Sequence, residues 1–471
     1  MGQDIPDSHF SRHDFVAFAR HLRQETALLA EYFRDDRFSS VHNVGGFEIE
    51  ACLVDQQGLP KPVNDPFLRI LNNPDVVTEL ASFNVELNVN PQVLQNHALR
   101  YLHEDLTRTW RECLVAAGKL DAGLMTVGVH PGLHEDELTL ANMSHNSRYR
   151  ALNEQVLASR NSEPIRLDIV GRDHLNTVHY DVMLEAATTS FQIHLQVRRG
   201  KAVRAYNAAL IASTPLVAAS ANSPYVFGHD LWAESRIPLF EQAVDVGFKD
   251  RKRVTFGQDY VHGSLFGLFE ENLDHYPVLL PYDSDEPPEQ FAHVKFHNGT
   301  IWRWNRPLIG FNQEGVPHLR IENRVVPSGP TIDDMIANAA FFWGLVRTLT
   351  DAPEPPELAM KFQTARRNFY NAARHGLDAT VCWLEGETIP VRELILDKLL
   401  PMAHDGLQYL EINPDDSRKY LGVIEARVTS RQNGAGWQRS WVKRNGKDMK
   451  TLSKAYFDWM QTGRPVHEWS I

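Results

Sequence analysis

The sequence predicts an α+β fold, and three observations carry this prediction. Between about residues 44 and 330, segments with the alternation or the β-branched content of strands predominate, and helical segments are interspersed among them. These helical segments are long and irregularly placed, which favours an α+β domain over the regular alternation of a doubly wound sheet. After residue 351 the pattern becomes mainly helical.

The chain begins with a predicted helix over residues 10–36, where apolar side chains recur at helical spacing. The strands predicted next are 44–54, 84–90, 123–130, 165–170, 190–198, 293–304 and 318–326. Helices are predicted between and after these strands at 95–120, 146–160, 201–220 and 331–350.

The clearest break in composition is residues 351–356, which contain three prolines. Helices are predicted beyond it at 357–375, 390–404 and 448–462. We therefore expect three units: an N-terminal helical segment over residues 1–40, a sheet domain over 41–350, and a mainly helical C-terminal region over 351–471 that packs on the sheet domain.

The bulk composition excludes several classes of partner. A net charge of −12 argues against nonspecific binding to nucleic acid or anionic membranes, and an anion such as ATP would need local metals and arginines. The chain lacks a long uncharged apolar run and a basic stretch followed by an apolar one at its start, so we expect a cytoplasmic protein without a membrane span. Three distant cysteines, Cys52, Cys113 and Cys382, form no disulfide framework and fit a reducing compartment.

Two carboxylates stand two residues apart in the predicted strand 44–54. Side chains alternate along a strand, so Glu48 and Glu50 share one face while Phe47 and Ile49 share the other. Like charges about 4 Å apart repel by roughly 4 kcal/mol at an effective dielectric near 20. Such a pair needs a cation, a shared proton or open water, and a divalent metal is the sharpest of these answers.

Two further segments add potential metal ligands. Glu86 lies on the polar face of residues 84–90, and Glu79 reaches the same site only if the chain turns between them. His194 shares a face with Gln192 and Gln196; such a histidine can be a divalent ligand or simply hydrogen-bonded.

Arginines accompany the last acidic strand. Arg320, Glu322 and Arg324 alternate with apolar residues, a pattern that also suits an edge strand whose charges pair with one another. Just upstream, Arg303 and Arg306 lie near tryptophans that could stack on a base or belong to the core. Together the four segments supply carboxylates and a histidine that suit Mg²⁺ ions, and arginines that suit a polyphosphate held by those ions. Neither a P-loop nor a Rossmann motif occurs.

The motifs resemble, in order, those of the glutamate–cysteine ligases and related carboxylate–amine ligases. The matching stretches are Gly-Phe-Glu-Ile-Glu at 46–50, Glu79 and Glu86 ahead of Pro91, 146–150, Gln192 to His194, 222–224, 302–307 and 321–324. The resemblance implies a glutamine synthetase-like antiparallel sheet with flanking helices, whose concave face binds ATP and metals, and makes 41–350 the catalytic domain. Two departures are Asn323, where an apolar residue is usual, and Glu79, where some members carry Asp.

The same resemblance implies roles for single residues. The metal ligands would be Glu48, Glu50, Glu79, Glu86, His194 and Glu322, and they would hold two or three Mg²⁺ ions. Arg306 and Arg324 would act in catalysis, at the γ-phosphate or the activated carboxylate. Arg148, Arg150 and Arg303 would hold ATP or a substrate carboxylate.

The activity implied by the resemblance is ATP-dependent ligation of a glutamate side-chain carboxylate to an amine through an acyl phosphate, with cysteine as the default acceptor. One alternative is a ligase of the same fold with another acid or amine. Others are a nucleotide-binding relative without turnover and a metal-dependent hydrolase or kinase. The expected partners are small molecules (an amino acid, an amine and ATP), and homo-oligomerisation stays open.

Overall fold

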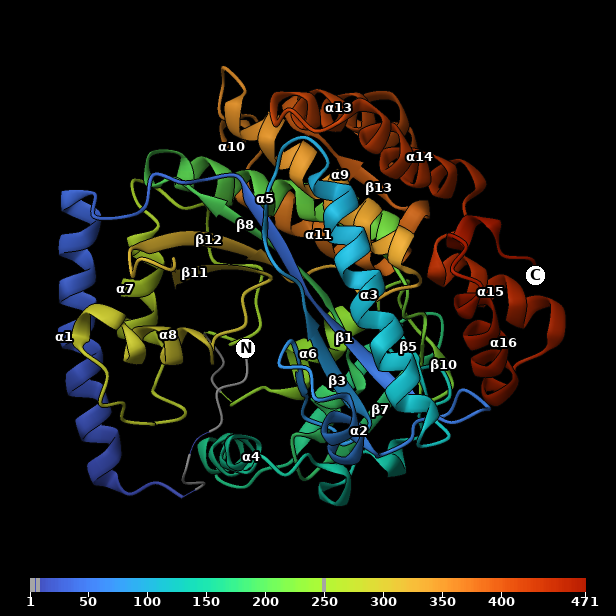
Figure 1. Cartoon of the computed structure of the whole chain (residues 1–471), viewed down its shortest axis with the longest axis horizontal. Helices are drawn as coiled ribbons and strands as arrows, with labels where there is room; N and C mark the ends of the chain where they lie inside the picture. Colours follow the sequence, from blue (N-terminus) through green and yellow to red (C-terminus); the bar gives the residue numbers. More distant parts are fainter. Residues whose placement is uncertain (1–4, 6–8, 248–250) are drawn as a thin grey trace.

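The computed structural model describes residue 5 and residues 9–247 and 251–471, so residues 1–4 and 6–8 of the predicted N-terminal segment lie outside the described part. Its centre is an antiparallel sheet in the order β11-β12-β8-β1-β3-β2, with β4 and β5 paired to the ends of β1 (Figure 1). The strands are β1 (Val44–Val54), β2 (Val76–Thr78), β3 (Asn84–Asn88), β4 (Gln92–Val93), β5 (Gly123–Met125), β8 (Phe191–Val197), β11 (Asn305–Phe311) and β12 (Pro317–Asn323).

One face of this sheet is apolar because every second residue of its strands is apolar. Ile49, Leu87, Ile193 and Ile321 are fully buried on it. Helices α3 (Ala98–Gly118), α5 (Arg199–Ser220) and α9 (Ile332–Asp351) gather on this side of the sheet. Each buried Ile or Leu contributes about 1.5–3 kcal/mol, which sets the register of the strands and turns the alternate side chains to the other face.

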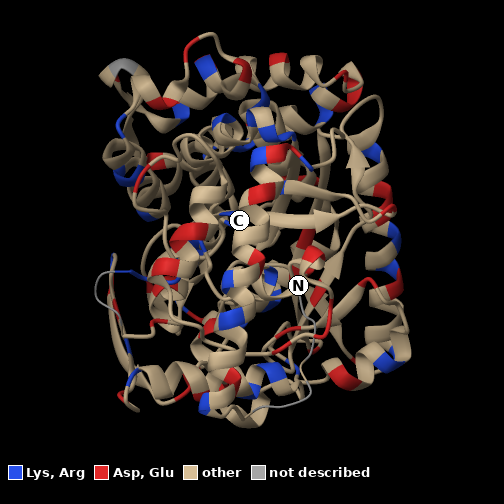
Figure 2. Ribbon diagram, turned by 90° about the vertical axis from the view of Figure 1, so that its left-hand side faces the viewer, with Lys and Arg blue, Asp and Glu red and all other residues tan. Residues whose placement is uncertain are grey.

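Smaller elements surround the sheet. They are α1 (Arg12–Asp35), α2 (Asn64–Leu71), α4 (Ser147–Ser159), α6 (Arg236–Ala243), α7 (Phe266–His275), α8 (Ala292–Asn298), the 3₁₀ turn η3 (Met183–Ala187), and the hairpins β6 (Ile165–Val170) with β7 (His174–His179) and β9 (Tyr225–Val226) with β10 (His229–Asp230). The outer helices carry both signs of charge (Figure 2). The predicted α+β class with an antiparallel sheet is confirmed.

The chain turns mainly helical after α9, as predicted, and α9 ends at the predicted break. The elements there are α10 (Pro356–Ala359), α11 (Phe362–His375), β13 (Thr380–Cys382), β14 (Thr388–Pro390), α12 (Val391–Leu394), a π-helical turn (Ile395–Leu399), α13 (Leu400–Tyr409), α14 (Pro414–Ser430), α15 (Gly434–Asn445) and α16 (Met449–Gln461). Helices α13 and α14 pack on α9. Leu29, Phe191 and Ile424 belong to one apolar cluster, and the division into three units stays a prediction.

One predicted strand is wrong. Residues 293–304 form helix α8 and a turn, and the strand β11 begins only at Asn305. His293, Lys295 and His297 alternate with Val294 and Phe296, which imitates a strand over so short a segment. In the helix, His293 and His297 lie one turn apart and are both buried, so packing decides the structure.

Two predictions about the chain as a whole can be compared with the structure. The three cysteines are free thiols. None of the helices in the described part of the chain has the length and apolar character that a bilayer crossing requires.

Helix α1 packs on α7 and α8 and is held there by an ionic chain that is buried at Glu25 and His293 and exposed at Asp283. His293 on α8 donates from Nδ1 to Glu25 of α1 at 2.6 Å and from Nε2 to Asp283 at 2.8 Å. Glu25 also accepts the amide of Val294 at 3.0 Å. Burial lowers the pKa of His293, but the two carboxylates outweigh burial and raise it above 6.5. The two carboxylates therefore favour the imidazolium form of His293.

We expect Glu25→Gln to lower the free energy of unfolding by about 1.5–3 kcal/mol, the range for a hydrogen bond to a charged group. A group whose pKa is raised by folding stabilises the folded state fully at pH values below its unfolded-state pKa. This stabilisation is lost as the pH rises through its folded-state pKa. The difference from wild type should thus be larger at pH 6 than at pH 9 in urea unfolding. The control Glu31→Gln, exposed on the same helix, should change little. A difference that grows with pH would contradict the charged pair.

Candidate active site

The polar face of the sheet collects acidic residues because the strand register places them opposite one another. Glu50 on β1 pairs with Glu86 on β3, and Glu48 lies opposite Gln192 of β8. His194 pairs with Glu322 of β12, which in turn pairs with Arg306 of β11. Cross-strand partners point to the same face, so residues from five strands meet on one surface.

Three of these residues, which we call the histidine group, are Glu48, His194 and Glu322. The Nε2 atom of His194 lies 3.5 Å from Glu48 Oε1 and 3.7 Å from Glu322 Oε1. Burial, followed by the nearby Arg320, lowers the pKa of His194 to about 3, so the ring is neutral at physiological pH. Glu48 Oε2 and His194 Nε2 are buried without a hydrogen-bond partner among the described residues.

A second set, the glutamate group, consists of Glu50, Glu79 and Glu86. The chain turns between β2 and β3, as the joint use of Glu79 and Glu86 required, and ligand atoms of the three carboxylates lie within 4.8 Å of one another. Burial raises the pKa of Glu50, Arg324 lowers it and Glu86 raises it, which together bring it to about 7. Burial and the neighbouring carboxylates also raise the pKa of Glu79 well above its ordinary value.

Glu50 is held in place from the neighbouring strand. The amide and hydroxyl of Ser190 donate to its two oxygens at 2.6 and 2.9 Å, and the Gln192 amide donates at 2.9 Å. These donors orient the carboxylate and leave the remaining lone pairs for a further partner.

Both groups fit a divalent metal. They offer hard carboxylate oxygens with one neutral imidazole, and buried atoms in the histidine group lack partners. Burying several carboxylates side by side is costly without a compensating cation, as the raised pKa values of the glutamate group express. Mg²⁺, which prefers oxygen ligands, suits this donor set.

Two arginines flank the histidine group. Arg306 donates from Nε and Nη2 to the two oxygens of Glu322 at 2.8 and 3.0 Å, a bidentate pair that is fully buried. Arg324 Nη1 lies 3.3 Å from Glu322 and also donates to Gln192. Burial would raise the pKa of Glu322, but the two guanidiniums outweigh it and lower the pKa far below its ordinary value. Arg324 Nε is buried and has no hydrogen-bond partner among the described residues.

A cavity of about 260 Å³ opens beside the histidine group. Glu48, His194 and Arg320 contribute side chains to its wall, together with Asn88 and His318. A small molecule there would therefore meet the Glu48 carboxylate and the Arg320 guanidinium at the same time.

Three predicted binding arginines lie differently. Arg303 is not on a strand: it donates to Asn272 and pairs with Glu271 of α7, so its guanidinium is used in packing rather than on the polar face. Arg150 is exposed on α4. The guanidinium of Arg148 lies over the ring of Phe296 at 5.5 Å.

Two residues of the site were missed by the sequence reasoning. Glu185 of η3 has a pKa raised to about 8 by burial and then by Glu50. Arg236 is buried and donates to the carbonyls of Arg324 and Val325 at 3.0 and 2.6 Å. Neither belongs to an alternating segment; for Arg236 the only available indication was its place after the turn at 222–224.

The comparisons with known proteins agree with this architecture. The structure resembles the glutamate–cysteine ligase of Francisella tularensis in complex with AMP, with a TM-score of 0.59 and 12% identity over 92% of this chain and 90% of that one. A bifunctional glutathione synthetase from Pasteurella multocida gives a TM-score of 0.49 and 13% identity over 93% of this chain and 55% of that one. The first likeness shows the fold. A search of curated proteins finds no match.

Family membership follows from the sequence match. The model of glutamate-cysteine ligase family 2 matches residues 44–456, which is most of the chain and includes every strand of the central sheet. The chain therefore belongs to glutamate-cysteine ligase family 2 and is a carbon–nitrogen ligase.

Proposed function

We propose that this carboxylate–amine ligase joins the side-chain carboxylate of glutamate to the amino group of cysteine, with ATP as the energy source and Mg²⁺ as the metal. One observation carries the proposal: two sets of potential metal ligands lie on one sheet face, and two arginines flank the histidine group. Metal ligands and arginines on one surface suit phosphoryl transfer to a carboxylate, since such transfer depends on positioning and charge neutralisation.

In the first step a carboxylate oxygen of glutamate attacks the γ-phosphorus of ATP. The bond from that phosphorus to the β–γ bridging oxygen breaks, ADP leaves, and an acyl phosphate forms. Arg324, whose Nε has no hydrogen-bond partner within the described part of the chain, would donate to the transferring group. Arg306 is held by Glu322, so its contribution is a fixed positive charge next to the phosphoryl oxygens.

In the second step the amine nitrogen attacks the acyl carbon. The carbon–oxygen bond to phosphate breaks, inorganic phosphate leaves, and the nitrogen loses a proton. We propose Glu185, whose pKa burial raises to about 8 and which is not one of the proposed metal ligands, as the carboxylate that accepts it.

The metal-binding roles divide between the two groups. The histidine group would hold one Mg²⁺ ion and the glutamate group another, and bound Mg²⁺ neutralises phosphate charge and makes the γ-phosphorus more electrophilic. The Francisella enzyme was solved in complex with AMP, which supports the proposal that this chain also binds an adenine nucleotide. Arg148 is proposed as a contact to phosphate or a substrate carboxylate.

ADP release identifies the acceptor. With ATP, Mg²⁺ and glutamate present, we expect cysteine to give faster ADP release than any other single amino acid or amine, with stoichiometric formation of the γ-glutamyl product. Rapid turnover with another amine and none with cysteine would show that cysteine is not the acceptor, while the ligase reaction would still stand. ADP release without any ligated product would contradict the proposed reaction.

A further inference from the structure

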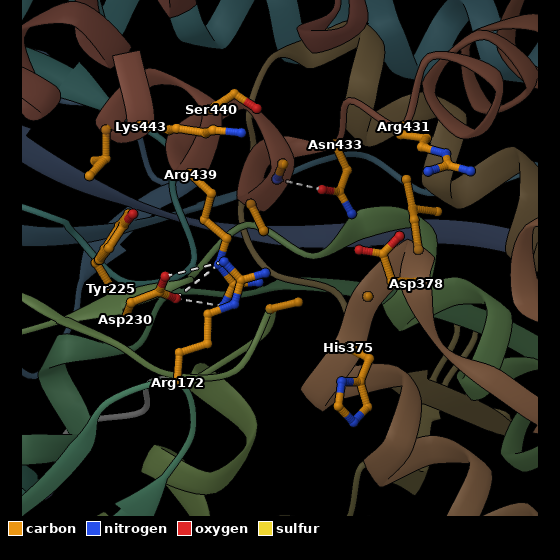
Figure 3. Close-up of a pocket in the computed structure, with 16 residues that line it drawn as sticks. Arg172, Tyr225, Asp230, His375, Asp378, Arg431, Asn433, Arg439, Ser440 and Lys443 are labelled. Atoms are coloured by element: carbon orange, nitrogen blue, oxygen red, sulfur yellow. Dashed lines mark hydrogen bonds and ion pairs between the residues drawn. The ribbon is translucent and has the colours of Figure 1, made fainter. Parts of the chain in front are cut away.

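A second polar cavity lies among the C-terminal helices, apart from the polar face of the sheet. It has a volume of about 490 Å³ and is bounded by α15, the end of β10 and the turn that follows α11. The stretch 428–439, whose glycines and arginines suggest a loop over a phosphate or an ordinary surface loop, forms the end of α14 and the start of α15 at its wall. Figure 3 shows the charged side chains around it.

The lining is positive although the chain as a whole is negative. Four cations, Arg172, Arg431, Arg439 and Lys443, face two carboxylates, Asp230 and Asp378, which leaves an excess of two positive charges. The whole chain carries −12. A concave site of this sign concentrates anions locally.

The two carboxylates do not neutralise the cations evenly. Arg439 donates from Nε and Nη2 to one oxygen of Asp230 at 2.9 and 2.7 Å, and Arg172 lies 3.5 Å from the other oxygen. Asp230 is thus shared by two guanidiniums. The side chains of Arg431 and Lys443 have no hydrogen bond or ion pair with any described residue, and they lie on different sides of the cavity in Figure 3.

The pKa of the neighbouring His375 is affected by the same positive charges. Burial lowers its pKa first, and Arg374, Arg439 and Arg172 lower it further against Asp378. The start of α15 adds little, because Asn433 already accepts the amide of Gly436 and the amide of Ala435 donates to a carbonyl. Side chains would therefore do the binding.

We propose that this cavity binds a phosphorylated small anion, with Arg431, Arg439 and Lys443 as the residues that contact its phosphoryl oxygens. An excess of two positive charges favours a ligand with at least two negative charges over a monocarboxylate. Arginine guanidiniums match phosphate oxygens in geometry, and the volume lies in the range of ordinary small-molecule sites. This site is separate from the ligase reaction and does not depend on its acceptor.

Inorganic pyrophosphate, titrated by calorimetry in EDTA at low salt, tests the proposal. Without divalent metal the carboxylates on the polar face of the sheet oppose anion binding there, so binding should mainly report the cavity. We expect saturable binding to the wild type, weakened at least tenfold in Arg431→Gln/Lys443→Gln. The control Lys450→Gln/Arg464→Gln removes the same charge from exposed positions outside the cavity and should stay within twofold.

Several outcomes would overturn the site. They are no saturable binding to the wild type, an equal loss in both double variants, and equally tight binding of glutarate, which would show that phosphoryl groups are not preferred. Both double variants replace exposed side chains, so circular dichroism and melting temperature should match the wild type. Unchanged binding in Glu50→Gln, which alters the polar face of the sheet, would support a separate site.

Discussion

Glu50→Gln should lower Mg²⁺-dependent ADP release by about 10²–10³-fold, the loss expected when several kcal/mol of charge stabilisation are removed from a phosphoryl transfer. The substitution keeps the size of the side chain and removes one charge from the glutamate group. Glu50 is the residue of choice because Ser190 and Gln192 already orient it, so the neutral amide stays close to the same place.

The control for this experiment is Glu163→Gln, a loss of charge at an exposed position after α4. It should retain wild-type turnover. Both variants should melt near the wild-type temperature, since burial already disfavours the charged form of Glu50. Unaltered turnover in Glu50→Gln, measured at saturating ATP and Mg²⁺, would show that the glutamate group is not part of the metal site.

Arg427→Met should lower the free energy of unfolding by about 3–5 kcal/mol, the cost of leaving a buried charge without its partner. Arg427 on α14 donates to Asp334 at 2.9 Å and to Asn338 at 2.7 Å, both on α9, and is fully buried. Asp334 also accepts the amide of Val466 at 3.0 Å. This ion pair therefore joins two segments of the C-terminal half, α14 and the turn at Val466, to the helix that covers the sheet.

Urea unfolding measures the change in the free energy of unfolding, and two further variants test whether the lost ion pair causes it. Arg418→Met, at an exposed position of the same helix, should cost less than about 1 kcal/mol, as surface charges usually do. Adding Asp334→Asn to Arg427→Met should recover part of the loss, because the unpaired carboxylate is then gone. If the single and the double variant lose the same stability, the charge is not the cause.

The convergence of the polar face could be predicted from strand alternation. Glu48, Glu50 and Glu86 lie on strands whose other face is apolar, so burial of that face determines where the carboxylates point. His194 and Glu322 follow the same rule. The roles of these residues as metal ligands and of the arginines in catalysis remain predictions.

Other features depend on contacts that no local pattern contains. Arg303 looks like a binding arginine beside tryptophans, yet Glu271 and Asn272 of a distant helix occupy its guanidinium. Residues 293–304 alternate like a strand over too few residues to exclude a helix, and the contact of His293 with Glu25 favours the helix. Glu185 lies in the short 3₁₀ turn η3 and Arg236 begins the short helix α6, and neither belongs to a segment with strand alternation.

The order of polar and apolar residues along each strand was enough to predict the α+β class and the face on which the acidic residues lie, and the motif resemblance predicted the family. This holds because the side-chain period of a strand is local and one apolar face must be buried. The pairing of each arginine, the place of Glu79 beside Glu86 and the basic cavity at α15 came only with the folded chain. They depend on charges that are distant in sequence and adjacent in space, where burial and neighbouring groups set each energy.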